Sequence, residues 1–350
     1  MAYLHHIKKT KDILSDDLHE LFVSSTTENI SEQIPKILGK YGMIVVTDVL
    51  SDDECDFHTS QIVQTITKLS DGVDHTDLST WRDKRLMPQI SPGVFNCGIG
   101  NTKAVWSVRL NPKVKQVYAQ AYGTDDLISS IDMINVKPPI EPFHDPDQID
   151  WAHTDNHNMF DRCVQGQVVL SNTSAGPLCS PRSHLICSAL LGFRRKHNIN
   201  SDPEARAEAK RMVELVGGKF QVPVIAPKGS VIMWLSSMLH SAKLMDRPVA
   251  SESFDGWKGW RCVVYLAYRP KIGVNKEHLA QLKLAYEKNL TTRHTGELFD
   301  AKDISKYPDH EKYTAKIHEI YQSVVIDSMF PIEELRQELT LDVMAALGMH

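Results

Sequence analysis

Apolar and polar residues alternate with two different periods along this chain, and the period changes near residue 128. Residues 30–39 carry apolar side chains at helical spacing, and the β-branched run 43–50 that follows is typical of a strand. Ser51 and Glu54 then form a capping-box pattern, which predicts that a helix begins directly after Ser51. The polar, turn-rich segment 70–102 predicts loops and short strands.

The middle of the chain consists of short β-like runs separated by turn residues. These runs cover 129–136, 163–171, 221–225, 229–235 and 260–268. The prolines between 138 and 146 oppose a helix before Trp151, and an amphipathic stretch at 204–216 interrupts the β pattern. Short strands at this spacing predict a sandwich or a barrel. After Pro270 the pattern becomes helical again.

The three patterns together predict one domain with a mainly β core and α decoration. We expect residues 1–127 to form a helical and mixed N-terminal support, 128–270 to form the β core, and 271–350 to form a helical extension. Within the extension, helical spacing covers 276–289, 310–328 and 331–347.

Composition narrows the functional classes. The 350 residues include 39 Lys and Arg against 44 Asp and Glu, a net charge of −5, which disfavours a nucleic-acid-binding domain. The longest apolar runs, such as 231–235, fall well short of the roughly 18 residues of a membrane span. Six cysteines without a CxxC pair favour reduced thiols. Because the N-terminus lacks the apolar core of a signal peptide, the expected location is the cytoplasm.

The most specific chemical signal is the pair His153 and Asp155. Side chains two apart on a strand point to the same face, so an imidazole and a carboxylate could bind one metal ion there. His240, at the end of an apolar run, is the best candidate for a third ligand. Two His and one carboxylate form the facial triad of non-haem Fe(II) oxygenases. The rival is a helical zinc site with His157, but Thr154 stands where such a site needs Glu.

Three segments around this triad resemble a known family. Residues 175–184 are similar to the Gly-x-Leu…Pro-Gly-Ser-His segment of the phytanoyl-CoA dioxygenase family, with Arg182 in place of the usual Gly. Residues 227–240 resemble the strand that carries the family's distal His, and 260–265 resemble its Arg-containing strand. The resemblance covers about residues 35–270, with the motifs in the same order.

This resemblance implies a double-stranded β-helix that binds Fe(II), with 2-oxoglutarate as co-substrate, together with O2. The implied reaction hydroxylates a C–H bond of a small or medium organic substrate and releases succinate and CO2. Halogenating relatives lack the carboxylate ligand, so Asp155 points to oxygenation. The family also implies that Arg261 binds the distal carboxylate of 2-oxoglutarate through its bidentate guanidinium. Arg261 follows His240 at a longer interval than is usual, which leaves Arg247 as a rival.

Further contacts are expected from the β core. Asn135 would contact the co-substrate, with a solvent-facing strand end as the alternative. Gln165 and Gln167 share one face of their strand, and they either face inward toward co-substrate or substrate or lie on an outer solvated face. Five residues could line a substrate entrance, unless they are ordinary packing and surface residues: Trp81, Arg82, Arg85, Trp106 and Arg109.

The alternative function is a non-catalytic double-stranded β-helix that binds a small ligand or a partner and retains a vestigial metal site. Such a protein would be expected to have lost a triad residue. Because His153, Asp155 and His240 are all present, the enzyme is the favoured interpretation.

Overall fold

The computed structural model describes most of the N-terminal 294 residues and one C-terminal helix. The described residues are 16–81, 86–87, 89–95, 98–140, 151–155, 163–172, 175–244, 256–287, 291–294 and 341–348. Within these ranges, no helix is both long enough and apolar enough to cross a membrane. The predicted helix 310–328, the predicted entrance residues Arg82 and Arg85, and the rival residues His157 and Arg247 lie outside them.

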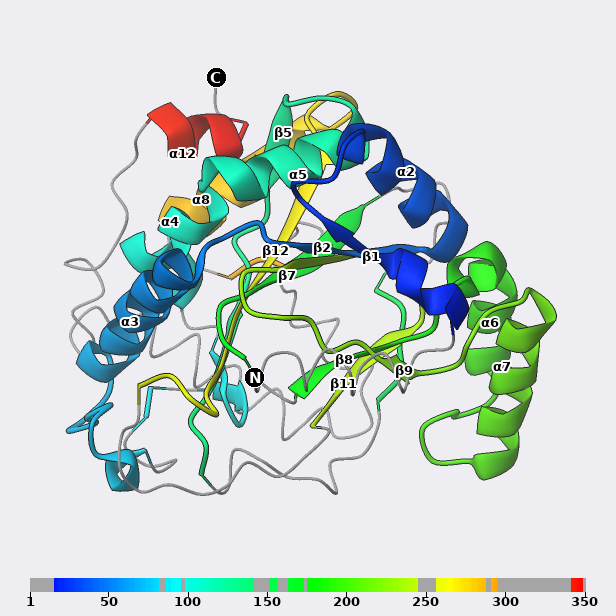
Figure 1. Cartoon of the computed structure of the whole chain (residues 1–350), viewed down its shortest axis with the longest axis horizontal. Helices are drawn as coiled ribbons and strands as arrows, with labels where there is room; N and C mark the ends of the chain where they lie inside the picture. Colours follow the sequence, from blue (N-terminus) through cyan, green and yellow to red (C-terminus); the bar gives the residue numbers. More distant parts are fainter. Residues whose placement is uncertain are drawn as a thin grey trace.

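The core consists of a large sheet and a small sheet (Figure 1). The large sheet contains β1 (Phe22–Ser24), β2 (Met43–Thr47), β3 (Gln89–Ser91), β4 (Val94–Phe95), β5 (Leu127–Ser129), β6 (Ile134–Lys137), β7 (Val164–Val169), β10 (Val231–Leu235) and β12 (Arg261–Pro270). The small sheet contains β8 (Ala175–Cys179), β9 (Val222–Pro223) and β11 (His240–Leu244). Its strand order is β11-β8-β9, and an isolated bridge adds His153 to β11.

The chain crosses repeatedly between the two sheets. From β6 in the large sheet it passes to His153 beside the small sheet and returns to β7 in the large sheet. It then crosses to β8 and β9 of the small sheet and returns to β10 of the large sheet. Finally it crosses to β11 of the small sheet and returns to β12 of the large sheet. The central order of the large sheet is β10-β7-β12-β6, and all three of these pairings are antiparallel. This winding of one strand pair around two sheets is the predicted double-stranded β-helix, and it confirms the fold class.

Helices cover the large sheet on the face away from the small sheet (Figure 1). They are α2 (Ile30–Tyr41), α3 (Asp52–Lys68), α4 (Lys103–Arg109), α5 (Pro112–Tyr122) and α8 (Lys276–Glu287), with α12 (Leu341–Ala346) beside them. The helices α6 (Cys187–Arg194) and α7 (Pro203–Leu215) lie beside the small sheet. Short 3-10 helices occur at η1 (Asp16–Leu21), η2 (Leu78–Thr80), η3 (Ile99–Asn101) and η4 (Ser183–Ile186).

The alternation of side chains along β7 separates two hydrophobic layers. Val164 and Val168 face the helices and belong to the large core cluster, whereas Val169 belongs to the cluster between the sheets. Ile232 and Trp234 of β10 also lie in this inner cluster. Polar side chains on the same face as Val169 therefore lie inside the barrel.

Local signals in the sequence explain several boundaries. The capping box is formed: Ser51 Oγ accepts a hydrogen bond from the Glu54 amide at 3.2 Å, and Glu54 Oε2 accepts one from the Ser51 amide at 2.8 Å. Arg182, at the position where the resembled family has Gly, has a left-handed φ of 69°. A glycine adopts this backbone conformation more easily than a residue with a side chain.

One predicted strand is wrong. Residues 129–136 form the end of β5, an irregular connection and then β6, because β5 and β6 pair with different parts of β12. The helices α4 and α5 were also not individually predicted.

Candidate metal centre

His153, Asp155 and His240 lie together at one end of the barrel. One ligand atom from each lies within 4.8 Å of the other two. The Asp155 carboxylate bridges the histidines: Oδ1 lies 3.3 Å from His153 Nε2, and Oδ2 lies 3.3 Å from His240 Nε2. Within the described ranges, this is the one group of at least three such side chains with metal-binding spacing.

The backbone places these ligands. His153 lies in an isolated antiparallel bridge with His240 rather than in a full strand, and the Asp155 amide donates to the Ser236 carbonyl at 3.0 Å. His240 is the first residue of β11, directly after the turn that follows β10. The predicted strand around His153 is therefore shorter than expected, but both side chains point to one site as predicted.

Both imidazoles have the tautomer that a metal ion requires. His153 Nδ1 donates to the Trp151 carbonyl at 3.1 Å, and His240 Nδ1 donates to the Met238 carbonyl at 3.0 Å. A carbonyl oxygen can only accept, so in each neutral ring the proton is on Nδ1 and the lone pair is on Nε2. Such second contacts orient metal-binding histidines.

The charges favour a cation between these atoms. Burial lowers the pKa of His153, which disfavours a second proton on its ring. Burial alone would raise the pKa of Asp155, but the charge and hydrogen bonds that His153 and His240 supply when they carry a second proton hold it well below its usual value. Asp155 Oδ2 is buried and makes no hydrogen bond to a described residue. Two lone pairs facing a carboxylate are a donor set that fits a divalent metal ion.

Aromatic side chains form the walls of the centre. The Trp151 ring stacks on His153 with centroids 4.3 Å apart and a 13° interplanar angle, and Trp151 is 48% exposed. On the other side, the Trp234 and His240 ring centroids lie 5.3 Å apart. Trp234 Nε1 donates to Gln165 Oε1 at 2.9 Å. Gln165 therefore positions an indole that packs against a metal-ligand candidate.

The remaining predicted site residues share the inner face of the large sheet. Gln167 pairs with Tyr265 across β7 and β12, and Asn135 pairs with Val263, two residues from Arg261. These positions alternate with the helix-facing layer, so the alternative of an outer solvated face for the glutamines is wrong. Asn135, Gln165, Gln167 and Arg261 are at most 6% exposed. Their roles toward a ligand stay predictions.

Three predicted entrance residues are instead packing residues. Trp81 is fully buried against Trp260, with ring centroids 5.0 Å apart. Trp106 and Arg109 are both fully buried in α4. The Arg109 guanidinium donates to the carbonyl of Asp132 at 2.6 Å and to that of Gly100. These contacts bond the two terminal nitrogens of a buried guanidinium, which the sequence pattern alone predicts at the surface.

Sequence reasoning also missed polar residues near the centre. Tyr265 Oη accepts a hydrogen bond from Asn135 Nδ2 at 3.4 Å, and its ring centroid lies 6.0 Å from that of His294. His294 Nδ1 bonds the Asp132 carboxylate. The alternation along β12 could have indicated Tyr265, but no motif surrounds His294.

The comparisons with known proteins support the fold and leave the family open. No family model matches the sequence. The "Ava biosynthesis cluster protein O" of Aspergillus versicolor is 28% identical over 130 residues, which are 36% of this chain and 41% of that protein. The chain thus aligns with about two fifths of this relative's length. Membership of the phytanoyl-CoA dioxygenase family stays a prediction.

Two solved structures illustrate the structural likeness. The hypothetical protein JW0805 from Escherichia coli superposes with a TM-score of 0.52 at 13% identity, covering 98% of this chain and 90% of that one. The epimerase SnoN, in complex with Fe3+, alpha ketoglutarate and nogalamycin RO, has a TM-score of 0.44 at 12% identity and covers 70% of this chain and 92% of its own. At these identities the likeness concerns the fold.

Proposed function

We propose that this protein is an Fe(II)- and 2-oxoglutarate-dependent dioxygenase that hydroxylates a C–H bond of a small or medium organic molecule. The observation that carries the proposal is the geometry of His153, Asp155 and His240. Both Nδ1 atoms are bonded to backbone carbonyls, and both Nε2 atoms face the same carboxylate at 3.3 Å. Two imidazoles and one carboxylate on one side of an iron ion leave positions for further ligands.

The inner face of the large sheet fits a polar co-substrate. Arg261 is 3% exposed, and a buried guanidinium suits a carboxylate that it can bind with two parallel hydrogen bonds. Gln165 Nε2 and Asn135 Oδ1 are buried and bond no described residue. Buried polar atoms of this kind are costly unless a ligand or water bonds them. They support 2-oxoglutarate binding between the sheets.

The protein's own residues supply position and environment. Bound Fe(II) and 2-oxoglutarate would supply an oxidation in which one oxygen atom of O2 enters succinate and the other enters the substrate C–H bond, with loss of CO2. His153 is oriented by its Nδ1 hydrogen bond to the Trp151 carbonyl and by its backbone hydrogen bonds with His240. Gln165 holds Trp234 against His240 through the indole hydrogen bond. The two indoles pack against the two histidine rings. Such preorganisation holds a site close to its productive geometry.

The retained carboxylate supports hydroxylation within this reaction class. Asp155 lies between both histidines, so a halide would have no ligand position in its place. The inner face of the large sheet carries Asn135, Gln165, Gln167 and Arg261 beside apolar side chains, and such a buried lining fits a small molecule better than a polymer.

The test is a screen of small organic molecules with the aerobic, Fe(II)-loaded protein. We expect at least one compound to stimulate succinate formation and to gain one oxygen atom by mass spectrometry. Asp155→Ala should abolish both signals, whereas the surface variant His197→Ala should keep them. Binding of 2-oxoglutarate without succinate formation, with or without any compound, would instead favour the non-catalytic binding protein.

A further inference from the structure

A short segment after α8 is docked at the end of the barrel that holds the triad. The Thr292 amide donates to the Ile131 carbonyl at 2.8 Å, and Thr292 Oγ1 accepts from the Ile131 amide at 2.9 Å. Thr291 and Thr292 are 4% and 0% exposed. Residues 291–294 are therefore held against the connection between β5 and β6, and the position of His294 is fixed by the backbone.

A chain of contacts leads from His294 to the metal centre. The Cys163 thiol donates to the His294 carbonyl, with Sγ and the oxygen 4.0 Å apart. The Cys163 carbonyl accepts a hydrogen bond from the Ser236 amide at 2.9 Å. The Ser236 carbonyl in turn accepts from the Asp155 amide at 3.0 Å. His294 and Asp155 thus lie at the same end of the barrel, on opposite sides of Cys163 and Ser236.

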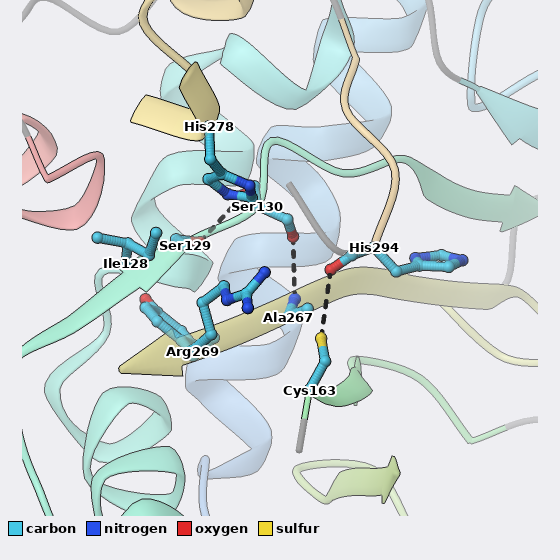
Figure 2. A pocket seen from close by; sticks show the side chains of 9 residues that line it. Ile128, Ser129, Ser130, Cys163, Ala267, Arg269, His278 and His294 are labelled. Atoms are coloured by element: carbon cyan, nitrogen blue, oxygen red, sulfur yellow. Dashed lines mark hydrogen bonds between the residues drawn. The ribbon is translucent and has the colours of Figure 1, made fainter. Parts of the chain in front are cut away.

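The ring of His294 lies beside the inner face of the large sheet. A small pocket behind it is lined by Ile128, Ser129, Ser130, Cys163, Ala267, Tyr268, Arg269, His278 and His294. Figure 2 shows that the His294 ring points away from the other residues of this pocket. Its centroid lies 6.0 Å from that of Tyr265, which faces the barrel interior opposite Gln167.

The hydrogen bond to Asp132 makes this ring a cation. Asp132 is fully buried, and its Oδ2 bonds His294 Nδ1, while the His294 side chain is 24% exposed. Burial would lower the pKa of His294, but Asp132, and the more distant charge of Asp155, raise it to about 9. No described residue bonds Nε2, so the second N–H of the imidazolium is directed to the open side.

We propose that His294 is a substrate-recognition residue whose Nε2–H binds an anionic oxygen, such as a carboxylate, of the substrate beside the metal centre. This inference rests on the proposed function and specifies its substrate class. An imidazolium fixed by a buried carboxylate donates a charge-assisted hydrogen bond, and it distinguishes an acid from the amide of the same shape. Asp132 acts through His294 and is a positioning residue.

The experiment compares acids with their amides. Zn(II)-loaded protein is saturated with N-oxalylglycine, a 2-oxoglutarate analogue, and the dissociation constants of benzoate, benzamide, hexanoate and hexanamide are measured by ligand-observed NMR. We expect each acid to bind about 10- to 100-fold more tightly than its amide, the range for a hydrogen bond to a charged group. His294→Asn, which can still donate to Asp132 but carries no charge, should lose this preference.

Two further variants complete the test. Asp132→Asn should also reduce the preference, whereas His278→Gln, on the other side of the same pocket, should keep it. If His294→Asn does not fold, the 15N shift of the His294 Nε2 in the parent protein must change when benzoate is added.

Each other outcome overturns the proposal. Three results exclude this role for His294 and leave the proposed function standing. They are equal binding of acid and amide by the parent, a preference that persists in His294→Asn, and an unchanged Nε2 shift. Failure of the Zn(II) and N-oxalylglycine complex to form excludes the proposed function and this inference together.

Discussion

His153 and His240 are joined through their backbones: the amide of each donates to the carbonyl of the other, and both distances are 2.8 Å. Their ring centroids lie 4.4 Å apart. Because the backbone fixes both Cα atoms and each Nδ1 bonds a carbonyl of its own segment, the separation of the two Nε2 atoms depends little on side-chain rotamers. The site is therefore preorganised before any metal ion binds.

Gln165 supports this arrangement through Trp234. In Gln165→Leu the buried indole Nε1 loses its acceptor, which should reduce the free energy of unfolding by about 1–3 kcal/mol. Because Trp234 packs against His240, metal affinity should also fall, by several-fold. Urea unfolding and Zn(II) titration measure the two effects. Gln167→Leu is the control, since Gln167 pairs with Ile232 rather than with Trp234 across β7 and β10. An equal loss of metal affinity there would remove the specific role of Gln165.

The capping box makes a prediction about the fold. Ser51→Ala removes the side-chain acceptor at the start of α3 and should lower the free energy of unfolding by about 0.5–2 kcal/mol. Ser188→Ala, at an exposed position in α6, should change it by much less. Chemical denaturation of both variants provides the measurement, and equal effects would show that the cap contributes nothing specific.

The His294–Asp132 pair predicts a pH dependence of stability. The folded pKa of His294 is about 9, above its ordinary value of 6.5, so between these pH values the folded state binds more protons than the unfolded state. This contribution is complete below pH 6.5 and is lost as the pH rises through 9. The metal-free protein should lose about 1–3 kcal/mol over this window relative to His294→Asn. Parallel pH profiles for the two proteins would contradict the ion pair.

Arg261 is expected to bind the distal carboxylate of 2-oxoglutarate. Arg261→Ala should weaken 2-oxoglutarate binding by about 10- to 100-fold, because a charge-assisted contact is lost. Metal affinity should hardly change, and Arg261→Lys should restore only part of the binding. Calorimetric titration of 2-oxoglutarate into each metal-loaded variant decides between Arg261 and Arg247. A large loss in Arg247→Ala with none in Arg261→Ala would transfer the role.

Local patterns predicted those parts of the fold that local interactions determine. The capping box at Ser51 and Glu54 needs only neighbouring residues, and the start of α3 follows from it directly. The triad was also predictable, since His153 and Asp155 are two residues apart and His240 begins a strand after an apolar run. Their ligand atoms lie within 4.8 Å of one another, which is the spacing that a shared metal ion requires.

Long-range contacts explain what the sequence could not show. The Arg109 guanidinium can be buried because it donates hydrogen bonds to the carbonyls of Gly100 and Asp132. Asp132 also bonds His294, which lies 162 positions later in the chain. No spacing in the sequence relates these residues, so their positions follow only from the packing of the C-terminal segment on the barrel.

The most direct test of the account is anaerobic addition of Fe(II) and then 2-oxoglutarate, followed by visible spectroscopy. The parent protein should bind one Fe(II) and develop a metal-to-ligand charge-transfer band when 2-oxoglutarate is added. His153→Ala and His240→Ala should bind iron much more weakly and lose the band, while His197→Ala should keep it. Variants at His153 and His240 that bind iron as tightly as the parent and give the same band would contradict the metal centre.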